Sequence, residues 1–338
     1  MRKLLITGIT GLIGASVLRK LIEGNYLKKA PEPITFQVLA IVRPQTDFLR
    51  YRDFTSHIEF IELDLSDLKK LKDVLYDFKP DVIVHIGALR GGRKFSRDEF
   101  YATNVFSTET MIEYCLHTRA ELLFCSSVGV FGAIPNELPA NNQTERVPDN
   151  YYHYTKIEAE KKINRAVLNG LRAAILRPSI TYGEGDHGFP ETLVRLVHKH
   201  RLPLTRKRIW IHLCNIDTIS SAFLWLLTND FPNGLAANIA DREPVQFRDL
   251  VNFVSRQLSN KNYPAFFEVD PKIFLYIERF MRFIKNELWI SRIQLISKSW
   301  FFDVSSAYDL MGLPEHYTIP DFKITIHDYL DSQKQIKP

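Results

Sequence analysis

A tyrosine and a lysine stand four residues apart in the stretch Asp149-Asn-Tyr-Tyr-His-Tyr-Thr-Lys156, which is predicted to open a helix. Because an α-helix turns once in about 3.6 residues, Tyr152 and Lys156 lie on one helical face. A lysine ammonium beside a phenol favours the phenolate, which lowers a phenol pKa that starts near ~10. We therefore expect a proton donor or acceptor that works near neutral pH, although this spacing also occurs often by chance.

Two hydroxyl groups, Ser126 and Ser127, follow the predicted strand 121–125. In an open parallel sheet, ligands bind outside the carboxyl ends of the strands. These hydroxyls are therefore expected at a ligand site. Together with the glycine turn at the start of the chain, they make chance a poor explanation of the Tyr–Lys pair.

The chain begins as strand, glycine turn and helix. An apolar run at residues 4–6 is followed by Gly8, Gly11 and Gly14 and then by a helical pattern over 15–22. Such a turn lets the backbone approach a pyrophosphate, which binds the free N–H groups at the helix N-terminus. The spacing is GxxGxxG rather than GxGxxG, so taken alone it also suits any glycine turn between a strand and a helix.

Two strand ends carry residues that could select the cofactor. The second predicted strand, 37–43, ends in Arg43, and no acidic residue follows before Asp47. An arginine here accommodates the 2′-phosphate of NADP, so the pattern favours NADP over NAD unless Arg43 is only a solvated strand-end residue. Asp64, after the strand 57–63, could accept a hydrogen bond from adenine or cap the helix that begins near residue 66.

The fourth predicted strand, 81–87, is almost wholly apolar and ends in the small residues Gly87-Ala88, over which a cofactor can pass closely. His85 within it is either a packed, hydrogen-bonded side chain or a catalytic one. In the loop that follows, Arg90 and Arg93 could meet a phosphate or remain solvated.

Composition excludes several classes of protein. The chain has 338 residues, 45% of them hydrophobic, a net charge of +5 and three cysteines far apart. We expect a folded α/β protein of one large or two small domains, with no nucleic-acid partner, no metal site and no transmembrane segment. The cysteines are expected to be reduced and buried, as in a cytoplasmic protein.

Taken together, these residues resemble the extended short-chain dehydrogenase/reductase family, also called the NAD-dependent epimerase/dehydratase group. The matching motifs occur in the family's order: Thr7-Gly8-xx-Gly11-xx-Gly14, Asp64-Leu65, His85-Ile-Gly-Ala88, Asn104, Ser126-Ser127, Tyr152-xxx-Lys156 and Arg177-Pro178. The resemblance implies an α/β fold with a Rossmann-type doubly wound parallel sheet. The expected cofactor domain is 1–178, rejoined by 209–241, and the expected C-terminal substrate-binding subdomain is 179–208 with 242–338.

The resemblance also implies a hydride transfer between nicotinamide and a secondary alcohol or ketone carbon. Tyr152 would be the general acid/base, Lys156 would hold the nicotinamide ribose, and Ser127 would bind the reacting oxygen. Asn104 would support the catalytic helix and a proton relay, and the helices that carry Asn104 and Tyr152 would form a homodimer. The implied cofactor-binding residues are Gly8, Thr10, Gly11, Leu12, Ile13, Gly14, Arg43, Asp64, Leu65, Gly87, Ala88, Tyr152, Lys156 and Pro178.

Departures from the family's patterns narrow the range of possible substrates. Val128-Gly129 follow the active-site hydroxyl where sugar-nucleotide 4,6-dehydratases have Asp-Glu, so an acid for the elimination of water is missing. Ile180 stands where sugar-nucleotide epimerases often have an asparagine. The stretch Leu176 to Asp186 is similar to that of the 3β-hydroxysteroid dehydrogenase branch, which favours an apolar substrate.

Residues 273–290 are expected to form one amphipathic helix. Its apolar stripe is Ile273, Ile277, Phe280, Met281, Ile284 and Leu288, and it is interrupted by Arg279, Arg282 and Lys285. The helix could be a lid over an apolar substrate or a contact with a membrane surface, or it could simply pack in the core of the subdomain.

Three functions therefore remain open. The first is an NADP-preferring oxidoreductase acting on a largely apolar substrate. The second is a sugar-nucleotide epimerase that retains NAD. The third is a non-catalytic dinucleotide-binding sensor or scaffold, against which the intact set of Ser127, Tyr152 and Lys156 argues.

Overall fold

The computed structural model covers residues 1–338. It describes all of them except residues 25, 27–34, 45, 47–56, 91–94, 265, 267, 285 and 336–338, together with the side chains of residues 287, 288 and 335. By internal contacts the chain divides into two units. The first comprises residues 1–130, 150–177 and 219–237, and the second comprises 131–149, 178–218 and 238–338. Relative to the expected division, residues 131–149, 178, 209–218 and 238–241 fall in the second unit.

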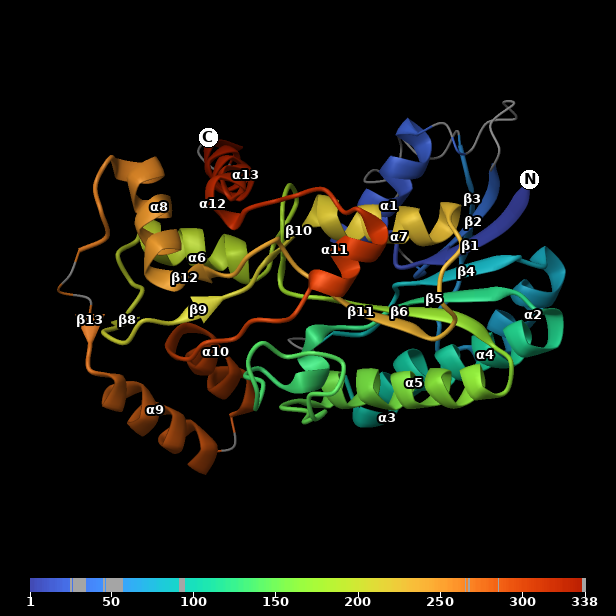
Figure 1. Cartoon of the computed structure of the whole chain (residues 1–338), viewed down its shortest axis with the longest axis horizontal. Coiled ribbons are helices and arrows are strands. Elements are labelled where there is room, and N and C mark those ends of the chain that lie inside the picture. Colours follow the sequence, from blue (N-terminus) through green and yellow to red (C-terminus); the bar gives the residue numbers. More distant parts are fainter. Residues whose placement is uncertain are drawn as a thin grey trace. The chain divides into compact units, whose positions relative to one another are not determined.

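A seven-stranded sheet is the centre of the first unit (Figure 1). Its strands are β1 (Arg2–Thr7), β2 (Phe36–Val42), β3 (Glu59–Glu62), β4 (Val82–His85), β5 (Glu121–Cys125), β6 (Arg172–Pro178) and β11 (Leu235–Ile239). Their order is β11-β6-β5-β4-β1-β2-β3, and the pairs from β6 to β3 are parallel. The direction of the strand order reverses between β1 and β4, which confirms the expected doubly wound sheet and marks the edge where ligands bind in such folds.

Helices cover both faces of this sheet. Figure 1 shows α1 (Leu12–Glu23) and α7 (Ile216–Thr228) on one face, and α2 (Leu68–Phe78), α4 (Ser107–Thr118) and α5 (Tyr151–Leu168) on the other. The segment that carries Asn104 is not one continuous α-helix. It runs as α3 (Arg97–Tyr101), a π-helical turn η2 (Ala102–Phe106) and α4. Such π turns occur often at functional sites.

The second unit is built from short strand pairs and helices. The pairs are β7 (Thr181–Tyr182) with β10 (Cys214–Asn215), β9 (Trp210–Ile211) with β12 (Val245–Gln246), and β8 (Leu204–Thr205) with β13 (Glu268–Val269). The helices are α6 (Phe189–His198), α8 (Phe247–Ser259), α9 (Pro271–Phe283), α10 (Glu287–Ser297), α11 (Ser305–Met311), α12 (Thr318–Asp321) and α13 (Lys323–Gln335). None of the helices in the described ranges is long and apolar enough to cross a bilayer.

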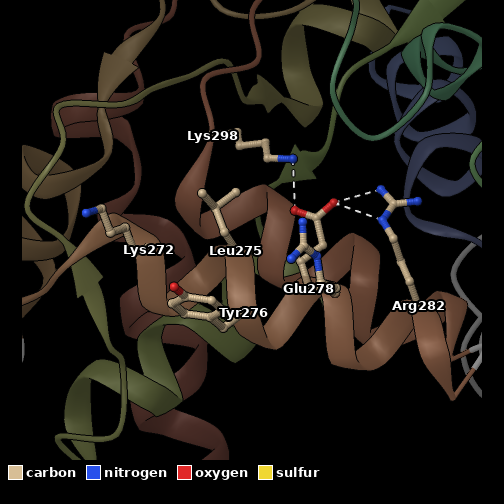
Figure 2. A pocket seen from close by; sticks show the side chains of 7 residues that line it. Lys272, Leu275, Tyr276, Glu278, Arg282 and Lys298 are labelled. Carbon is tan, nitrogen blue, oxygen red and sulfur yellow. Dashed lines mark hydrogen bonds and ion pairs between the residues drawn. The ribbon is translucent and has the colours of Figure 1, made fainter.

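The single helix expected over residues 273–290 is wrong. The chain forms α9, shown in Figure 2, and then a second helix, α10, which begins where the side chain of Asn286 accepts a hydrogen bond from the backbone N–H of Trp289. The apolar stripe of α9 is also not core, because Ile273, Ile277 and Phe280 are exposed. Of the residues assigned to that helix, Lys285 and the side chain of Leu288 lie outside the described part of the chain.

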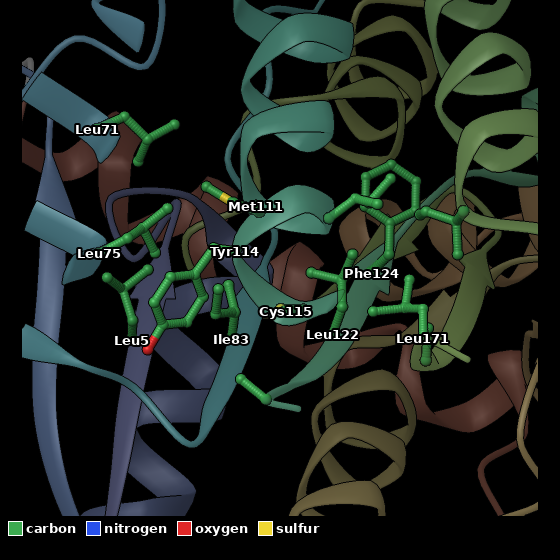
Figure 3. Packing of buried hydrophobic residues seen from close by; sticks show 14 of the residues in the cluster. Leu5, Leu71, Leu75, Ile83, Met111, Tyr114, Cys115, Leu122, Phe124 and Leu171 are labelled. Atoms are coloured by element: carbon green, nitrogen blue, oxygen red, sulfur yellow. The ribbon is translucent and has the colours of Figure 1, made fainter. Parts of the chain in front are cut away.

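A cluster of apolar side chains between the sheet and α2, α4 and α5 holds the first unit together (Figure 3). Leu5 of β1, Ile83 of β4 and Leu122 of β5 are fully buried there against Leu75 of α2 and Met111 of α4. Burial of a side chain of this size contributes about 1.5–3 kcal/mol, so these contacts fix the strands in register. The carboxyl ends of β1, β4 and β5 are thereby held at one edge of the sheet.

Candidate active site

Tyr152 and Lys156 lie in the first two turns of α5, which begins at Tyr151 after the capping residue Asn150. Lys156 is only 2% exposed, and its Nζ donates a hydrogen bond of 2.7 Å to the carbonyl oxygen of Cys125 at the end of β5. The same Nζ lies 4.5 Å from the ring centre of Phe124 and 6.0 Å from that of Tyr152. The helix therefore places the ammonium next to the phenol, as the four-residue spacing predicts.

Burial moves the pKa values of both side chains. It lowers the pKa of Lys156 to about 8, against the opposing charges of Cys125 and Glu160. Burial also raises the pKa of Tyr152 well above its usual range, with Cys125 adding to the rise and Arg90 opposing it. The expected lowering of the tyrosine pKa is therefore wrong for the protein without ligands, because loss of water outweighs the nearby positive charge.

Ser127 stands where β5 passes into the 3₁₀ turn η3 (Val128–Phe131). Its Oγ accepts a hydrogen bond of 3.0 Å from the backbone N–H of Gly129, which leaves the hydroxyl hydrogen as a donor. A Cβ on Gly129 would lie 2.0 Å from Nε2 of His153, so the turn packs directly on the start of α5. The residue that carries the hydroxyl and the helix that carries Tyr152 thus meet.

Asn104, in the π-helical turn, ties three segments together. Its side chain accepts a hydrogen bond from the N–H of Leu89 (2.8 Å) and donates to the carbonyl of Leu89 (3.0 Å) and to Oγ1 of Thr155 (2.9 Å). Thr155 in turn donates to the carbonyl oxygen of Tyr152 at 2.7 Å. Asn104 is therefore linked to α5 through Thr155, a residue not among the expected ones, although its place beside Lys156 was a usable signal.

The three glycines of the turn differ in how much space surrounds them. A Cβ on Gly8 would lie 2.5 Å from the N of Gly87, and one on Gly14 would lie 2.3 Å from the carbonyl oxygen of Gly8, so both are needed for packing. A Cβ on Gly11 would instead meet only that carbonyl oxygen, at 3.4 Å. Gly11 is exposed, so the space in front of it is open.

The helix behind this turn presents its own donors. α1 begins at Leu12, and its cap residue Gly11 has no side chain that could accept a hydrogen bond from the first turn. The backbone N–H groups at Leu12 and Ile13, next to the half-buried Thr10, therefore face the open space with the positive end of the helix dipole. An open glycine, free N–H donors and a positive dipole together fit the pyrophosphate of a dinucleotide.

Thr7 links β1 to β4 at the point where the strand order reverses. Its Oγ1 accepts a hydrogen bond from the N–H of Gly87 (2.9 Å) and lies 2.8 Å from Nδ1 of His85. Burial, helped by the charge of Lys156, lowers the pKa of His85 to about 3, so the ring is neutral. These contacts agree with the interpretation of His85 as a packed, hydrogen-bonded side chain. Thr7 holds the backbone of Gly87 in place.

Two expected cofactor residues flank this edge. Arg43 is exposed just after β2, and its carbonyl oxygen accepts hydrogen bonds from Thr46. Asp64 accepts two hydrogen bonds from Ser66 through Oδ1, whereas Asp67 caps α2, so the capping role expected for Asp64 is wrong. Asp64 remains exposed and keeps Oδ2 as an acceptor.

The remaining predicted residues are placed as follows. Leu65 is buried, and its Cδ1 would lie 3.0 Å from a Cβ on Gly87. Pro178 is buried at the end of β6, the first residue of the second unit's middle segment. Arg90 is exposed, while Asp47 and Arg93 lie outside the described residues.

Neither disulfides nor metal clusters are found in the described part of the chain. Cys115, Cys125 and Cys214 are buried thiols outside any disulfide, as expected. Among the residues that the structure describes, no group of three or more His, Cys, Asp or Glu side chains could hold a metal ion.

Comparison with known proteins gives a family match over most of the chain. The model of the family described as "NAD dependent epimerase/dehydratase family" matches residues 4–240. The 3beta-hydroxysteroid dehydrogenase/Delta(5)-Delta(4) isomerase 1 of Caenorhabditis elegans is 24% identical over 254 residues, 68% of this chain and 51% of that protein. Methionine adenosyltransferase 2 subunit beta of Bos taurus is 30% identical over 186 residues, 54% of this chain and 48% of that protein.

The match to these curated relatives thus spans about half of their length. Among solved structures, the UDP-glucuronic acid 4-epimerase of Bacillus cereus in complex with NAD superposes with a TM-score of 0.71 and 20% identity. The superposition covers 98% of this chain and 99% of that chain. At this identity the likeness establishes the fold.

Proposed function

Because the chain belongs to the NAD-dependent epimerase/dehydratase family, we propose that it transfers a hydride between a nicotinamide cofactor and a secondary alcohol or ketone carbon. The observation that carries the proposal is the buried ammonium of Lys156 beside Tyr152, on a helix against which the Ser127 turn packs. This group of side chains lies at the carboxyl end of β5, in a sheet whose switch point carries the glycine turn.

The residues at the switch point fit a nicotinamide dinucleotide. The N–H groups of Leu12 and Ile13 would bind its pyrophosphate beside Gly11, and Asp64 would accept a hydrogen bond from its adenine. Lys156 would hold the nicotinamide ribose. When bound, such a cofactor gives a hydride to the substrate carbon or takes one from it.

The chain's own residues would then manage the proton. In the reducing direction, Tyr152 donates its phenolic proton to the substrate oxygen as the carbonyl becomes an alcohol, and Ser127 holds that oxygen by a hydrogen bond. The positive charge of Lys156 stabilises the phenolate that remains. Since burial raises the pKa of Tyr152, the phenol is protonated at neutral pH and can serve as the proton donor.

Substrate and cofactor preference follow from the departures noted above. Ile180, Val128 and Gly129, with the dehydrogenase relative from Caenorhabditis elegans, support a largely apolar substrate bound by the second unit. The exposed Arg43 supports NADP over NAD.

Each of the two alternative functions is supported by one of the comparisons. The likeness to a UDP-glucuronic acid 4-epimerase favours a sugar-nucleotide epimerase that retains NAD. The Bos taurus relative is named as a subunit of an enzyme, so the sensor or scaffold that binds a partner chain is kept as the second alternative.

Nucleotide content distinguishes these functions. The purified protein is denatured, any released nucleotide is identified by mass, and the empty protein is titrated with NADPH and NADH. We expect an empty site that prefers NADPH. Tightly retained NAD would favour the epimerase, and no affinity for either nucleotide would refute the cofactor assignment.

Two further expectations remain predictions. A homodimer through the helices that carry Asn104 and Tyr152 is consistent with Phe106, Leu116 and Leu168, which these helices expose. Sedimentation tests it, and cell fractionation tests the cytoplasmic location.

A further inference from the structure

Helix α9 is attached to the second unit by a narrow strip of its surface. Its buried residues are Phe274 and Glu278, four positions apart, and α10 is the described helix that packs beside it. Seven apolar side chains on or just after α9 are instead exposed: Ile273 (44%), Leu275 (57%), Tyr276 (68%), Ile277 (39%), Phe280 (57%), Phe283 (83%) and Ile284 (47%). Most of this helix is therefore in contact with solvent.

Leu275 lies on the flank that also carries Arg282, and the other six exposed apolar side chains share one face. At about 100° per residue they fall within an arc of roughly 120°, turned away from the strip that contains Phe274. We call these six residues the apolar arc. An exposed, contiguous set of large apolar and aromatic side chains marks an interaction surface rather than ordinary scatter.

Cationic side chains line the edge of α9 beside this arc. Lys272 and Arg279 are exposed and, with Arg282, lie on the flank between the arc and the buried strip. This flank lines a pocket of about 480 Å³, and Figure 2 shows its lining side chains, which include Lys298.

The acidic group on this flank is already neutralised. Glu278 is 6% exposed. It accepts hydrogen bonds or ion pairs from Arg282 (2.7 Å), Lys298 (2.9 Å) and Gln294 (2.8 Å). The exposed charged side chains within α9 are therefore basic, and the exposed carboxylate beside them is that of the capping residue Asp270.

We propose that α9 docks on the surface of an anionic phospholipid bilayer. The apolar arc enters the boundary between head groups and acyl chains, and Lys272 and Arg279 contact lipid phosphates. Helices with an apolar, aromatic face and a Lys/Arg-rich flank bind membranes in this way, and each basic residue near an anionic surface adds to the attraction. Trp289 on the neighbouring α10 is 49% exposed and suits the same interface.

The positive charge of the α9 flank favours a lipid surface over a second copy of the chain as the partner of the apolar arc. A two-fold contact through the arc would bring the same basic flank toward itself, and like charges repel. An anionic lipid surface complements both the arc and the flank. Thirteen residues are too few to span a bilayer, so α9 lies along the surface.

Vesicle flotation tests the proposal with the full chain. Wild type is mixed with vesicles of phosphatidylcholine alone or with about one third phosphatidylserine. We expect binding to the second kind only, with loss at high salt and a blue shift of tryptophan emission that Trp289→Phe reduces. The double variants Phe280→Ser/Phe283→Ser and Lys272→Glu/Arg279→Glu should each weaken binding roughly tenfold or more.

Two matched double variants outside α9 test whether a loss of vesicle binding is specific to that helix. Leu310→Ser/Ile324→Ser removes exposed apolar groups of the same unit, and Lys69→Glu/Lys72→Glu reverses exposed charges on α2. Both should bind vesicles as wild type does. All substituted side chains are exposed, so we expect the variants to fold, and circular dichroism checks this. The salt dependence of wild-type binding tests the electrostatic contribution without any substitution.

Three outcomes would overturn the proposal. Wild type could fail to float with either vesicle, or the α9 variants could bind as well as their controls. Alternatively, sedimentation without lipid could reveal a dimer that Phe280→Ser/Phe283→Ser dissociates, in which case the arc covers a second copy.

Discussion

At the scale of single residues, Lys156 is a charged group held almost without water. Its ammonium donates to the carbonyl of Cys125, and the nearby carboxylate of Glu160 is occupied by two hydrogen bonds from Arg177 (2.8 and 2.7 Å). Burial lowers the pKa of Lys156 only to about 8, so the side chain stays mostly protonated at neutral pH. A buried positive charge next to a protonated phenol is what proton donation to a carbonyl requires.

Replacing the phenol tests that chemistry directly. We predict that Tyr152→Phe lowers kcat about 10²- to 10⁴-fold in NADPH-dependent reduction of apolar ketones, because it removes the proton donor and little volume. Nucleotide affinity, measured by titration, should change little.

The matched control is Tyr154→Phe, two residues along the same helix. It should react at the wild-type rate. If Tyr152→Phe retained full activity, another acid would have to be found. If neither protein had activity but both bound nucleotide, the non-catalytic role would gain support.

At the scale of elements, the β1–α1 turn shows how packing and ligand binding divide among similar residues. Gly14 lies where a side chain would collide with the backbone of Gly8 and Ile9 (2.3 and 2.8 Å). Gly11 borders open space. One glycine therefore serves the fold, and the other leaves room for a ligand.

Two alanine variants separate these roles. We predict that Gly14→Ala destabilises the protein by ~1–3 kcal/mol or prevents folding, since backbone atoms cannot move aside cheaply. Gly11→Ala should cost only about 0.5 kcal/mol of stability, yet weaken nucleotide binding roughly tenfold or more. Thermal unfolding and nucleotide titration measure the two effects. Equal losses of stability in both variants would contradict this division.

At the scale of the whole molecule, the two units are stabilised by different means. The first has the apolar cluster around its sheet. The second buries Asp241, whose carboxylate accepts hydrogen bonds from the hydroxyls of Tyr182 and Thr318 and from the N–H of Asn215. These partners come from distant parts of the sequence, so the network connects the segments of that unit.

A histidine in the same unit makes stability depend on pH. His316 lies between two carboxylates, with Nε2 3.1 Å from Asp217 and Nδ1 2.7 Å from Asp321. The hydrogen bond with Asp217, and then that with Asp321, raises the pKa of His316 to about 9 against a desolvation cost. Since its unfolded pKa is near ~6.5, its contribution is complete below that pH and is lost as pH rises through about 9.

We predict that His316→Gln lowers the free energy of unfolding by on the order of 1–2 kcal/mol at pH 6, and by much less near pH 10, since part of the site is exposed. Chemical denaturation across this range measures it. The exposed His327→Gln is the control. The quantity to compare is the difference in the free energy of unfolding between variant and wild type at each pH. In both proteins burial lowers the pKa of Lys156 to about 8, which makes stability rise with pH and so opposes the effect of His316. A difference independent of pH would refute the charged pair.

The sequence alone determined what depends on near neighbours in the chain. The strand 121–125 has the expected bounds, and Tyr152 and Lys156 share a face, because apolar runs and the helical period act locally. The motif order also identified the family.

Only the tertiary structure decided what depends on surroundings. An amphipathic stripe is the same pattern whether a core or solvent lies beside it, so the exposure and the early end of α9 were not predictable. The spacing of Tyr152 and Lys156 predicted their contact. The direction of the tyrosine pKa shift depended on how much water the packed chain removes. Likewise, the links from Asn104 to Leu89 and Thr155 join segments that only folding brings together.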